Sequence, residues 1–353
     1  MSEYNGFIKV DDFLLQMVQE GQIPGAVYAL VNKDETIAEN AIGFAHKDLK
    51  IPMTLDTVFD LASLTKVCVT TPAILLLIQE GHIDLDDPVK RFYPNTVSEN
   101  LTIKHLLTHT TSLPPHVPFY KQGLGKRDIL QFIITRHVAV NQAVNYSDLN
   151  FMLLGFIIEK ITGQSLDEYA KNHIFDPLHM GHTGFHLNIE KDKIAPTEWM
   201  ASINDYQWGE VHDENAHHLG GICGHAGLFS NLEDMKKYVQ MLLRGGLTET
   251  GEPLISSAIL RESKRNFTAA LNLNRGLGWQ LVDDAFSPLG YFLSKNSYGH
   301  TGFTGTSFWI DPDKEIGVIL LSNRVHISRA INMNRIRRVV HNLVAASLSP
   351  NDK

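Results

Sequence analysis

Strand-like sequence lies near both ends of this chain, with helix-like sequence between them. Runs rich in β-branched and aromatic residues occupy 26–46 and 277–323. Helical periodicity dominates residues 126–180. Strands so far apart in sequence can share a sheet only if the middle of the chain forms a separate insertion. We therefore expect an α+β fold, with one antiparallel sheet flanked by the terminal helices and an inserted all-helical domain.

The terminal helices and the domain limits follow from the same pattern. Residues 7–20 place their apolar side chains near one face, and residues 328–348 form the second terminal helix. We expect a sheet domain of residues 1–62 and 220–353 and a mainly helical domain of residues 63–219. A chain of 353 residues is long enough to bury a large core in such a fold.

Composition narrows the classes of partner and compartment. The net charge of −8 argues against a nucleic-acid-binding surface, and two cysteines are too few for a disulfide framework. We expect no membrane span, because no apolar stretch reaches the required length. The first residues lack the basic start of a signal peptide, so a chain that begins natively at Met1 is expected to be cytoplasmic. A secreted protein that has lost its leader is the alternative.

Ser63-Leu-Thr-Lys66 is the first candidate for chemistry. If a helix begins at Ser63, Lys66 lies one turn later on the same face as the hydroxyl. A lysine can activate a serine when burial and nearby cations lower the lysine pKa. The apolar flanks predict a buried Lys66, and Pro72 is expected to kink the helix or start its second segment. The alternative is an N-cap serine followed by a solvated lysine.

Tyr146-Ser147-Asp148 directly precedes an apolar helical run. A tyrosine at such a junction can reach into a cleft, and a neighbouring ammonium favours its phenolate form, so it can carry a proton to a leaving group. The alternative is an ordinary helix start with Ser147 or Asp148 as the N-cap.

Residues 298–305, YGHTGFTG, hold three glycines beside a strand-like run. Glycine next to a strand often marks a close approach of the backbone to another group, such as a substrate. The alternative is a simple hairpin turn.

The order and spacing of these three motifs resemble the serine β-lactamase and penicillin-binding-protein superfamily, with its S-x-x-K, its Tyr-led triplet and its K-T-G strand. The Tyr-led form is similar to class C β-lactamases, D,D-peptidases, D-aminopeptidases and the family VIII-type esterases. The resemblance covers nearly the whole chain, including the segments 106–113, 155–169 and 176–185. It implies a β-lactamase-like fold with the active site in the cleft between the two domains.

The resemblance also implies roles for individual residues. Ser63 would be the acylated nucleophile, Lys66 would keep it reactive, and Tyr146 would be the general base and the proton donor to the leaving group. The backbone N–H groups of Ser63 and Phe303 would form the oxyanion hole. The substrate cleft would be lined by Asp148, His300, Thr301 and Gly302.

Two residues depart from the family pattern. Asp148 stands where asparagine is usual, and a carboxylate cannot donate to a substrate carbonyl, so it should pair with Lys66 instead. His300 replaces the lysine of K-T-G, so we expect a partly charged group near neutral pH and a pH-dependent hold on a substrate carboxylate. Both changes weaken the case for efficient β-lactam hydrolysis.

Two further clusters have plain interpretations. The segment 209–230 collects histidines and acids that suggest a metal site, but regular zinc spacing is missing and acylation of a serine needs no metal. We expect that segment to form part of the cleft wall, with no metal or cofactor; its candidate ligands are His212, Asp213, Glu214, His217, His218 and His225. Arg335, Arg337 and Arg338 in the last helix are expected to form a solvated face.

The predicted function is therefore a serine hydrolase that cleaves an ester or amide bond through an acyl-enzyme on Ser63. Its expected partner is a small-molecule or peptide-like substrate. Within this fold the alternatives are a carboxylesterase, and a muropeptide amidase or D-amino-acid peptidase. A non-catalytic penicillin-recognising protein is the alternative from another class.

Overall fold

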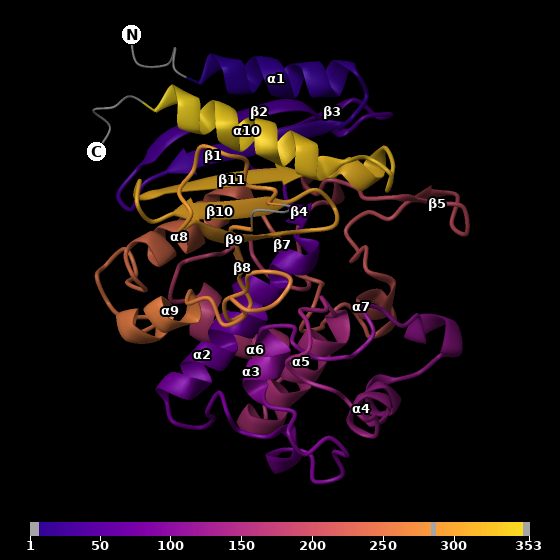
Figure 1. The fold of residues 1–353 in the computed structure, drawn as a ribbon. Helices are drawn as coiled ribbons and strands as arrows, with labels where there is room; N and C mark the ends of the chain where they lie inside the picture. Colours follow the sequence, from indigo (N-terminus) through magenta and orange to yellow (C-terminus); the bar gives the residue numbers. More distant parts are fainter. Residues whose placement is uncertain (1–6, 284–286, 349–353) are drawn as a thin grey trace.

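The computed structural model describes residues 7–283 and 287–348. Its main element is a seven-stranded antiparallel sheet built from both ends of the chain (Figure 1). The strands in spatial order are β3 (Ile51–Pro52), β2 (Thr36–His46), β1 (Gly25–Val31), β11 (Ile316–Ser322), β10 (Ser307–Asp311), β9 (Tyr298–Thr301) and β8 (Gln280–Leu281).

The two ends of the chain meet at the centre of this sheet. Strand β1 pairs with β11 from Ala26 opposite Ser322 to Val31 opposite Gly317. Every residue of both strands is buried. Their sequences, GAVYALV and IGVILLS, are almost continuously apolar, as expected for strands covered on both faces. The predicted sheet of α+β type is confirmed.

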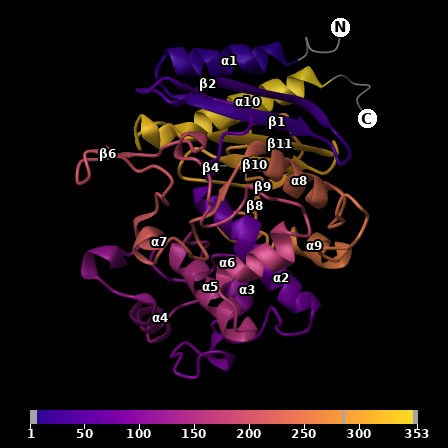
Figure 2. The same ribbon diagram turned by 180° about the vertical axis from the view of Figure 1, so that it is seen from behind.

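Helices cover the two faces of the sheet (Figures 1 and 2). The terminal helices α1 (Ile8–Gln19) and α10 (Met333–Ser347) lie together on one face, and α8 (Leu232–Leu243) packs against β1, β10 and β11 on the other. The face under α1 and α10 has its own hydrophobic cluster, which includes Trp309. A larger cluster runs from the opposite face into the helical part.

The helical part lies beyond α8, on the side of the sheet away from the termini (Figure 1). Helix α5 is buried along most of its length and contacts α2, α3, α4 and α6. The helices of this part are α2 (Thr71–Gln79), α3 (Ile103–Leu107), α4 (Lys126–Ile134), α5 (Asp148–Thr162), α6 (Leu166–Ala170), α7 (Glu214–His218) and α9 (Ser257–Ser263). The short strand pairs are β4 (Phe59–Asp60) with β7 (Phe229–Ser230), and β5 (Trp199–Met200) with β6 (Asp205–Tyr206).

Three predicted helix ends are confirmed. Thr102 caps α3 in a reciprocal arrangement with His105. Gly163 ends α5 with a positive φ of 71°, a conformation that glycine adopts without steric cost. Ser165 caps α6 through a capping box with Glu168. The limits of the two predicted domains stay a prediction.

The start of the last helix is wrong, and the helical stretch at Ser63 opens one residue earlier and not as an α-helix. No α-helix begins at Ser63: the chain forms a 3₁₀ turn over Ala62–Leu64 and a π-helical turn over Lys66–Thr70, and α2 begins only at Thr71. Pro72 lies in the first turn of α2, as predicted, where its missing N–H costs nothing. The last helix begins at Met333 rather than at residue 328, because a 3₁₀ turn at Arg324–His326 and a bend precede it.

One apolar run does reach membrane-spanning length, contrary to prediction. The helical stretch Ala62–Gln79 is long and apolar enough by composition, but 83% of it is buried inside the protein. A core helix passes the same test, and this stretch packs against α5 and α9.

Candidate active site

Ser63 sits on a strained turn between strand β4 and the helical stretch that follows. The preceding residue, Ala62, has a φ of 48°, a left-handed conformation that costs a non-glycine residue about 1–2 kcal/mol. Two hydrogen bonds maintain this turn: the Ala62 N–H donates to Asp60 at 2.7 Å, and the Thr65 hydroxyl donates to the Ala62 carbonyl at 2.7 Å. Backbone strain of this kind clusters at functional sites.

Lys66 lies directly beneath Ser63 in the protein interior. Its ammonium donates three hydrogen bonds: to the Ser63 hydroxyl at 3.0 Å, to the Asp148 carboxylate at 2.9 Å and to the His225 carbonyl at 3.0 Å. The π-helical turn carries the lysine, and such turns often occur at functional positions. The ammonium therefore uses all three of its hydrogens.

The charge state of Lys66 differs from the prediction. Burial alone would lower the pKa of Lys66, but the nearby Asp148 and, more weakly, Tyr146 outweigh it and raise the pKa above its ordinary value. The expectation of a lysine brought towards neutrality is therefore wrong, while the predicted pairing of Lys66 with Asp148 is confirmed. A charged lysine that already donates to Ser63 cannot take the serine proton, so a different base is needed.

Tyr146 lies next to that lysine, at the start of α5. Its ring centroid is 5.0 Å from the Lys66 ammonium and 4.5 Å from the ring of His109. His109 holds the turn in place, because its Nδ1 accepts the Ser147 N–H at 3.1 Å. Ser147 is the N-cap residue, but its hydroxyl donates to the Pro114 carbonyl rather than capping the helix. Ser63 and Tyr146 line the same two cavities.

Strand β9 brings His300 and Thr301 to the other side of Ser63. His300 is 1% exposed, and its ring centroid is 6.0 Å from that of Tyr146. Burial, followed by the charges of Arg275 and Lys66, holds the pKa of His300 well below its ordinary value. The predicted partial charge near neutral pH is therefore wrong. A neutral His300 cannot supply the positive charge that the lysine of the K-T-G pattern has at this position.

Gly302 confirms the expected close approach of the backbone. A Cβ atom there would lie 2.1 Å from the Thr306 hydroxyl and 2.5 Å from the Leu61 carbonyl. The next residue, Phe303, has its carbonyl fixed by the Arg324 guanidinium, which donates to it at 2.9 Å. Its ring is exposed and stacks on His212, with centroids 5.7 Å apart.

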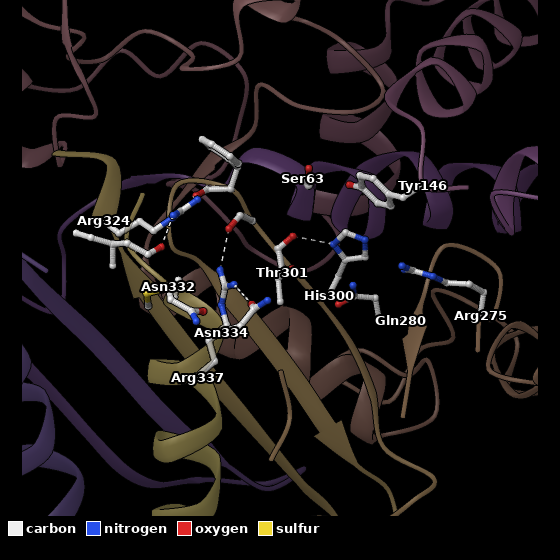
Figure 3. A pocket seen from close by; sticks show the side chains of 14 residues that line it. Ser63, Tyr146, Arg275, Gln280, His300, Thr301, Arg324, Asn332, Asn334 and Arg337 are labelled. Atoms are coloured by element: carbon white, nitrogen blue, oxygen red, sulfur yellow. Dashed lines mark hydrogen bonds between the residues drawn. The ribbon is translucent and has the colours of Figure 1, made fainter. Parts of the chain in front are cut away.

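The first cavity beside Ser63 has a volume of about 330 Å³ and a strongly basic lining (Figure 3). Arg275, Arg324 and Arg337 contribute to it, and none of its lining residues in the described parts of the chain is acidic. Arg337 corrects the expected solvated face of the last helix. It is 4% exposed and donates to the carbonyls of Gly302 and Thr306, both at 2.8 Å. Of the predicted basic face only Arg335 is exposed, and Arg338 is partly buried.

The second cavity, of about 360 Å³, opens on the other side of Ser63 and Phe303. His212, Asp213 and Glu214 line it, which confirms that the segment 209–230 forms part of the cleft wall. Arg329 joins this wall from the far end of the chain and pairs with Glu214 at 2.7 Å.

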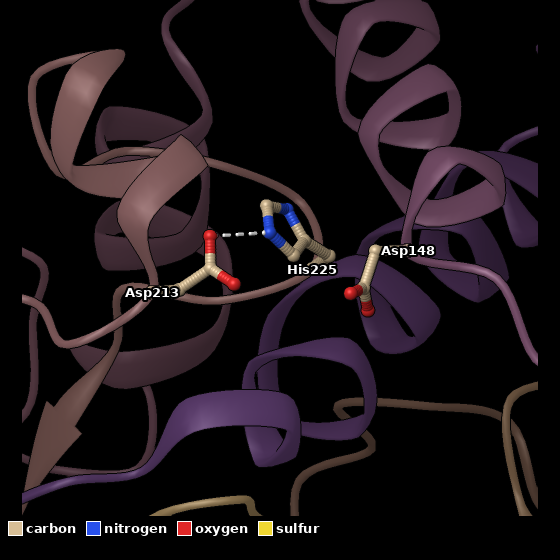
Figure 4. A group of neighbouring side chains, drawn as sticks. All are labelled: Asp148, Asp213 and His225. Carbon is tan, nitrogen blue, oxygen red and sulfur yellow. Dashed lines mark hydrogen bonds and ion pairs between the residues drawn. The ribbon is translucent and has the colours of Figure 1, made fainter. Parts of the chain in front are cut away.

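In the part of the chain that the structure describes, Asp148, Asp213 and His225 form a group that could hold a metal ion, with ligand atoms within 4.8 Å of one another (Figure 4). His225 donates to Asp213 at 2.8 Å. Burial disfavours a charged His225, but Asp213 and Cys223 outweigh it and raise the His225 pKa well above its ordinary value. Burial would likewise raise the Asp213 pKa, but His225 lowers it. A protonated His225 is not a ligand, and the Lys66 ammonium on Asp148 repels a cation, so the group suits an ion-pair network better than a metal.

Sequence reasoning missed two residues around the site, His109 and Arg275. It also placed Arg337 on a solvated face and did not predict the pairing of His225 with Asp213. A signal existed for Arg337, which falls on the apolar stripe of α10 with Met333, Ile336 and Val340. His109 lies in a segment that contributed to the family resemblance. For Arg275 no local pattern distinguishes a buried arginine from a solvated one.

Comparisons with known proteins identify the family to which the chain belongs. A model of the family described as Beta-lactamase matches residues 10–342. A protein of Escherichia coli O157:H7, provisionally named D-alanyl-D-alanine carboxypeptidase, is 33% identical over 369 residues, which cover 90% of this chain and 82% of that protein.

Two solved structures share the fold. A penicillin-binding protein homologue from Caulobacter crescentus has a TM-score of 0.77 at 19% identity and covers 98% of each chain. EstCE1, described as a hydrolase with promiscuous acyltransferase activity, has a TM-score of 0.75 at 22% identity and covers 96% of this chain and 99% of its own. Because the family model spans almost the whole chain, and the serine, lysine and tyrosine motifs meet at one cavity, this protein belongs to the β-lactamase family of serine hydrolases.

Proposed function

We propose that this protein cleaves an amide or ester bond in a peptide-like substrate that carries a free carboxylate, through an acyl-enzyme on Ser63. In this mechanism Tyr146, as phenolate, takes the Ser63 proton while the serine oxygen bonds to the substrate carbonyl carbon. The phenol then gives the proton to the leaving group as its bond to that carbon breaks. Water hydrolyses the ester on Ser63 and restores the enzyme.

The charged Lys66 has a supporting role in this scheme. It donates to Ser63 at 3.0 Å and lies 5.0 Å from the Tyr146 ring, so it orients the hydroxyl and stabilises the phenolate. The N–H groups of Ser63 and Phe303 are the proposed oxyanion donors. The bond from Arg324 to the Phe303 carbonyl fixes the following peptide and so supports that geometry. One such donor is typically worth about 3–4 kcal/mol in the transition state.

The observation that carries the substrate class is the basic cavity beside Ser63. Two of its arginines, Arg275 and Arg337, are at least nine-tenths buried and each keeps one guanidinium nitrogen without a hydrogen-bond partner among the described residues. Burial and Arg324 lower the pKa of Arg337 to about 9, which leaves it charged at neutral pH. Both side chains line the cavity, and a carboxylate is the group that pairs best with a guanidinium. The name of the Escherichia coli relative points to the same class of substrate.

A matched pair of substrates tests this proposal. An N-acylated D-alanyl-D-alanine peptide and its C-terminal amide differ only in the carboxylate. We expect kcat/KM to favour the free carboxylate by about 30-fold, equivalent to roughly 2 kcal/mol for a buried charge pair. Equal turnover of the two peptides would contradict the assigned substrate class.

The nucleophile and base are tested separately. Intact mass spectrometry with a mixed ester, amide and β-lactam set should show an acyl adduct on the parent and none on Ser63→Ala. Tyr146→Phe should lose about 10²–10⁴-fold in turnover with little loss of stability. An adduct or parental turnover in Ser63→Ala would refute the assigned nucleophile.

A carboxylesterase is the second candidate, favoured by the exposed Phe303 ring that opens onto the second cavity with Tyr120. This wall suits an apolar acyl group attached to a small alcohol. Chromogenic esters of increasing acyl length, compared with the peptide pair above, separate the two. Efficient turnover of long-chain esters with none of the peptides would select the esterase.

A further inference from the structure

Arg329 joins three segments of the chain at the second cavity. It lies in the loop between the 3₁₀ turn Arg324–His326 and α10, and it lines that cavity together with Glu214. Its Nε donates to the two carboxylate oxygens of Glu198 at 2.9 and 2.7 Å, and its Nη2 lies 2.6 Å from the same carboxylate. Nη2 also donates to Glu214 at 2.7 Å. The last part of the chain is thereby tied to two points of the 198–214 segment.

Each group in this network is fixed by its own part of the fold. The Glu198 carbonyl accepts the Gln207 N–H at 2.8 Å, at the base of the β5–β6 hairpin, and Glu214 lies in the first turn of α7. The Arg329 carbonyl accepts from the Arg324 guanidinium at 2.7 Å, so the backbone and the side chain of Arg329 are both held. A single exposed ion pair contributes little, but a network with the forked geometry of arginine keeps its side chains in one place.

The network stays charged at neutral and mildly acidic pH. The hydrogen bond with His212 lowers the pKa of Glu198, burial opposes this, and Arg329 adds to the lowering, so that the pKa falls to about 2. The bond to Glu198 raises the pKa of Arg329, again against burial, and Glu214 adds to the rise. An apolar group placed against these side chains would remove charged atoms from water without replacing their hydration.

The Phe303 ring offers the same cavity an apolar surface. The residue lines both cavities and is 46% exposed. Its ring centroid is 5.7 Å from that of His212 and 5.8 Å from the Arg329 guanidinium carbon. The apolar surface is therefore small, because the charged guanidinium borders it.

We propose that Arg329 is a specificity-determining residue that limits the acyl part of the substrate to short groups. This inference rests on the proposed function: the first cavity receives the carboxylate on the leaving-group side of the scissile bond, which leaves the second cavity for the acyl part. A short acyl group can pack on the Phe303 ring alone. A longer apolar chain would have to displace Arg329 from its carboxylates or desolvate them, and either event costs binding free energy.

Chromogenic esters with one leaving group and different acyl chains test this inference. We compare the kcat/KM values of the octanoyl and acetyl esters of p-nitrophenol. Their ratio, octanoyl over acetyl, should rise by about 10-fold or more in Arg329→Ala, because a single methylene group in a pocket can already change specificity by that factor. Arg335→Ala is the control, since Arg335 is exposed and lines neither cavity, and it should keep the parent ratio. An unchanged ratio in Arg329→Ala overturns the proposal.

A second variant covers the case in which Arg329→Ala does not fold. Glu198→Gln keeps the guanidinium but removes the carboxylate that accepts both Nε bonds, so the ratio should rise in the same direction by a smaller factor. The ratio compares two substrates of one preparation, so an inactive fraction does not change it. An equal loss for both esters would show a merely structural arginine and would overturn the proposal.

Intact mass spectrometry after acid quenching separates failure of this inference from failure of the proposed function. With an equimolar mixture of the two esters, the parent should carry mainly the acetyl adduct on Ser63, and Arg329→Ala should carry a larger share of the octanoyl adduct. The same proportion in both proteins would overturn the role of Arg329 and leave the acyl-enzyme in place. Neither adduct nor turnover in either protein would refute the acyl-enzyme and this inference together.

Discussion

Replacement of Asp148 by asparagine tests the charge network on which the site depends. The substitution keeps the shape of the side chain but removes the carboxylate that lies 2.9 Å from the Lys66 ammonium. The lysine side chain is 0% exposed and that of the aspartate 19%. After the change, the ammonium has only neutral acceptors: Ser63, the His225 carbonyl and the amide oxygen of the introduced asparagine.

The expected loss follows from the burial of this pair. Removing one partner of a buried ion pair typically costs about 3–5 kcal/mol, because a charge is left without compensation. The partial exposure of Asp148 places the loss near the lower end, at about 3 kcal/mol. Its position in the first turn of α5 adds a helix-dipole contribution of about 0.3–1 kcal/mol. This loss is a large fraction of the total free energy of unfolding of a typical domain, which is about 5–15 kcal/mol.

The sign of the pH dependence distinguishes the loss of the buried ion pair from a general packing defect. In the parent, the raised pKa of Lys66 gives stability that is complete below the unfolded value of 10.5 and is lost as pH rises through the folded value. Without Asp148, burial dominates and lowers the folded pKa. The variant should then gain stability as pH rises towards 10.5, so that its deficit shrinks from about pH 7 to about pH 10.

Urea unfolding at the two pH values measures both effects. Asp128→Asn is the matched control, because Asp128 also lies in the first turn of a helix but is exposed. It should cost less than about 1 kcal/mol. The double variant Lys66→Met with Asp148→Asn should be more stable than Asp148→Asn alone, since no buried charge remains. A loss below about 0.5 kcal/mol, or a loss independent of pH, would refute the reasoning.

Two other substitutions have definite expectations. Asp213→Asn should destabilise the protein by about 3 kcal/mol by leaving His225 unpaired. The raised pKa of His225 gives stability that is complete below its unfolded value of 6.5. The loss in the variant should therefore be largest below pH 6.5 and shrink above it. Urea unfolding measures this dependence, and a loss that is constant with pH would contradict the assigned cause. Gly224→Ala would place a Cβ 2.1 Å from the Phe151 carbonyl and should cost about 1–3 kcal/mol in thermal unfolding. Gly181→Ala, with no atom within 4 Å, is its control, and equal effects of the two would exclude the close approach as the cause.

Local sequence was sufficient to predict most of the helices and strands. The ends of α5 and α6 are encoded by Gly163 and Ser165, whose backbone preferences act within one turn. The segment at Ser63 could not be predicted in this way. Its 3₁₀ and π turns depend on contacts with distant residues, such as the bond from the Thr70 hydroxyl to the Gly224 carbonyl.

The motifs at Ser63, Tyr146 and His300 could be found because each has a recognisable local pattern. The groups that set the charges of these motif residues could not be found in the same way. Arg275 and Arg337 look like ordinary surface arginines in sequence, and only the folded chain shows that both are buried and line the same cavity as Ser63.

The sequence by itself therefore determined the sheet formed by both ends of the chain and the three residues proposed for the chemistry. Hydrophobic periodicity and short motifs are local properties, so they can be recognised from the sequence alone. The tertiary structure decided that Lys66 is charged and that His300 is neutral. A pKa depends on the burial and the charges around a group, and here Asp148 and Arg275 lie 82 and 25 residues away in the sequence.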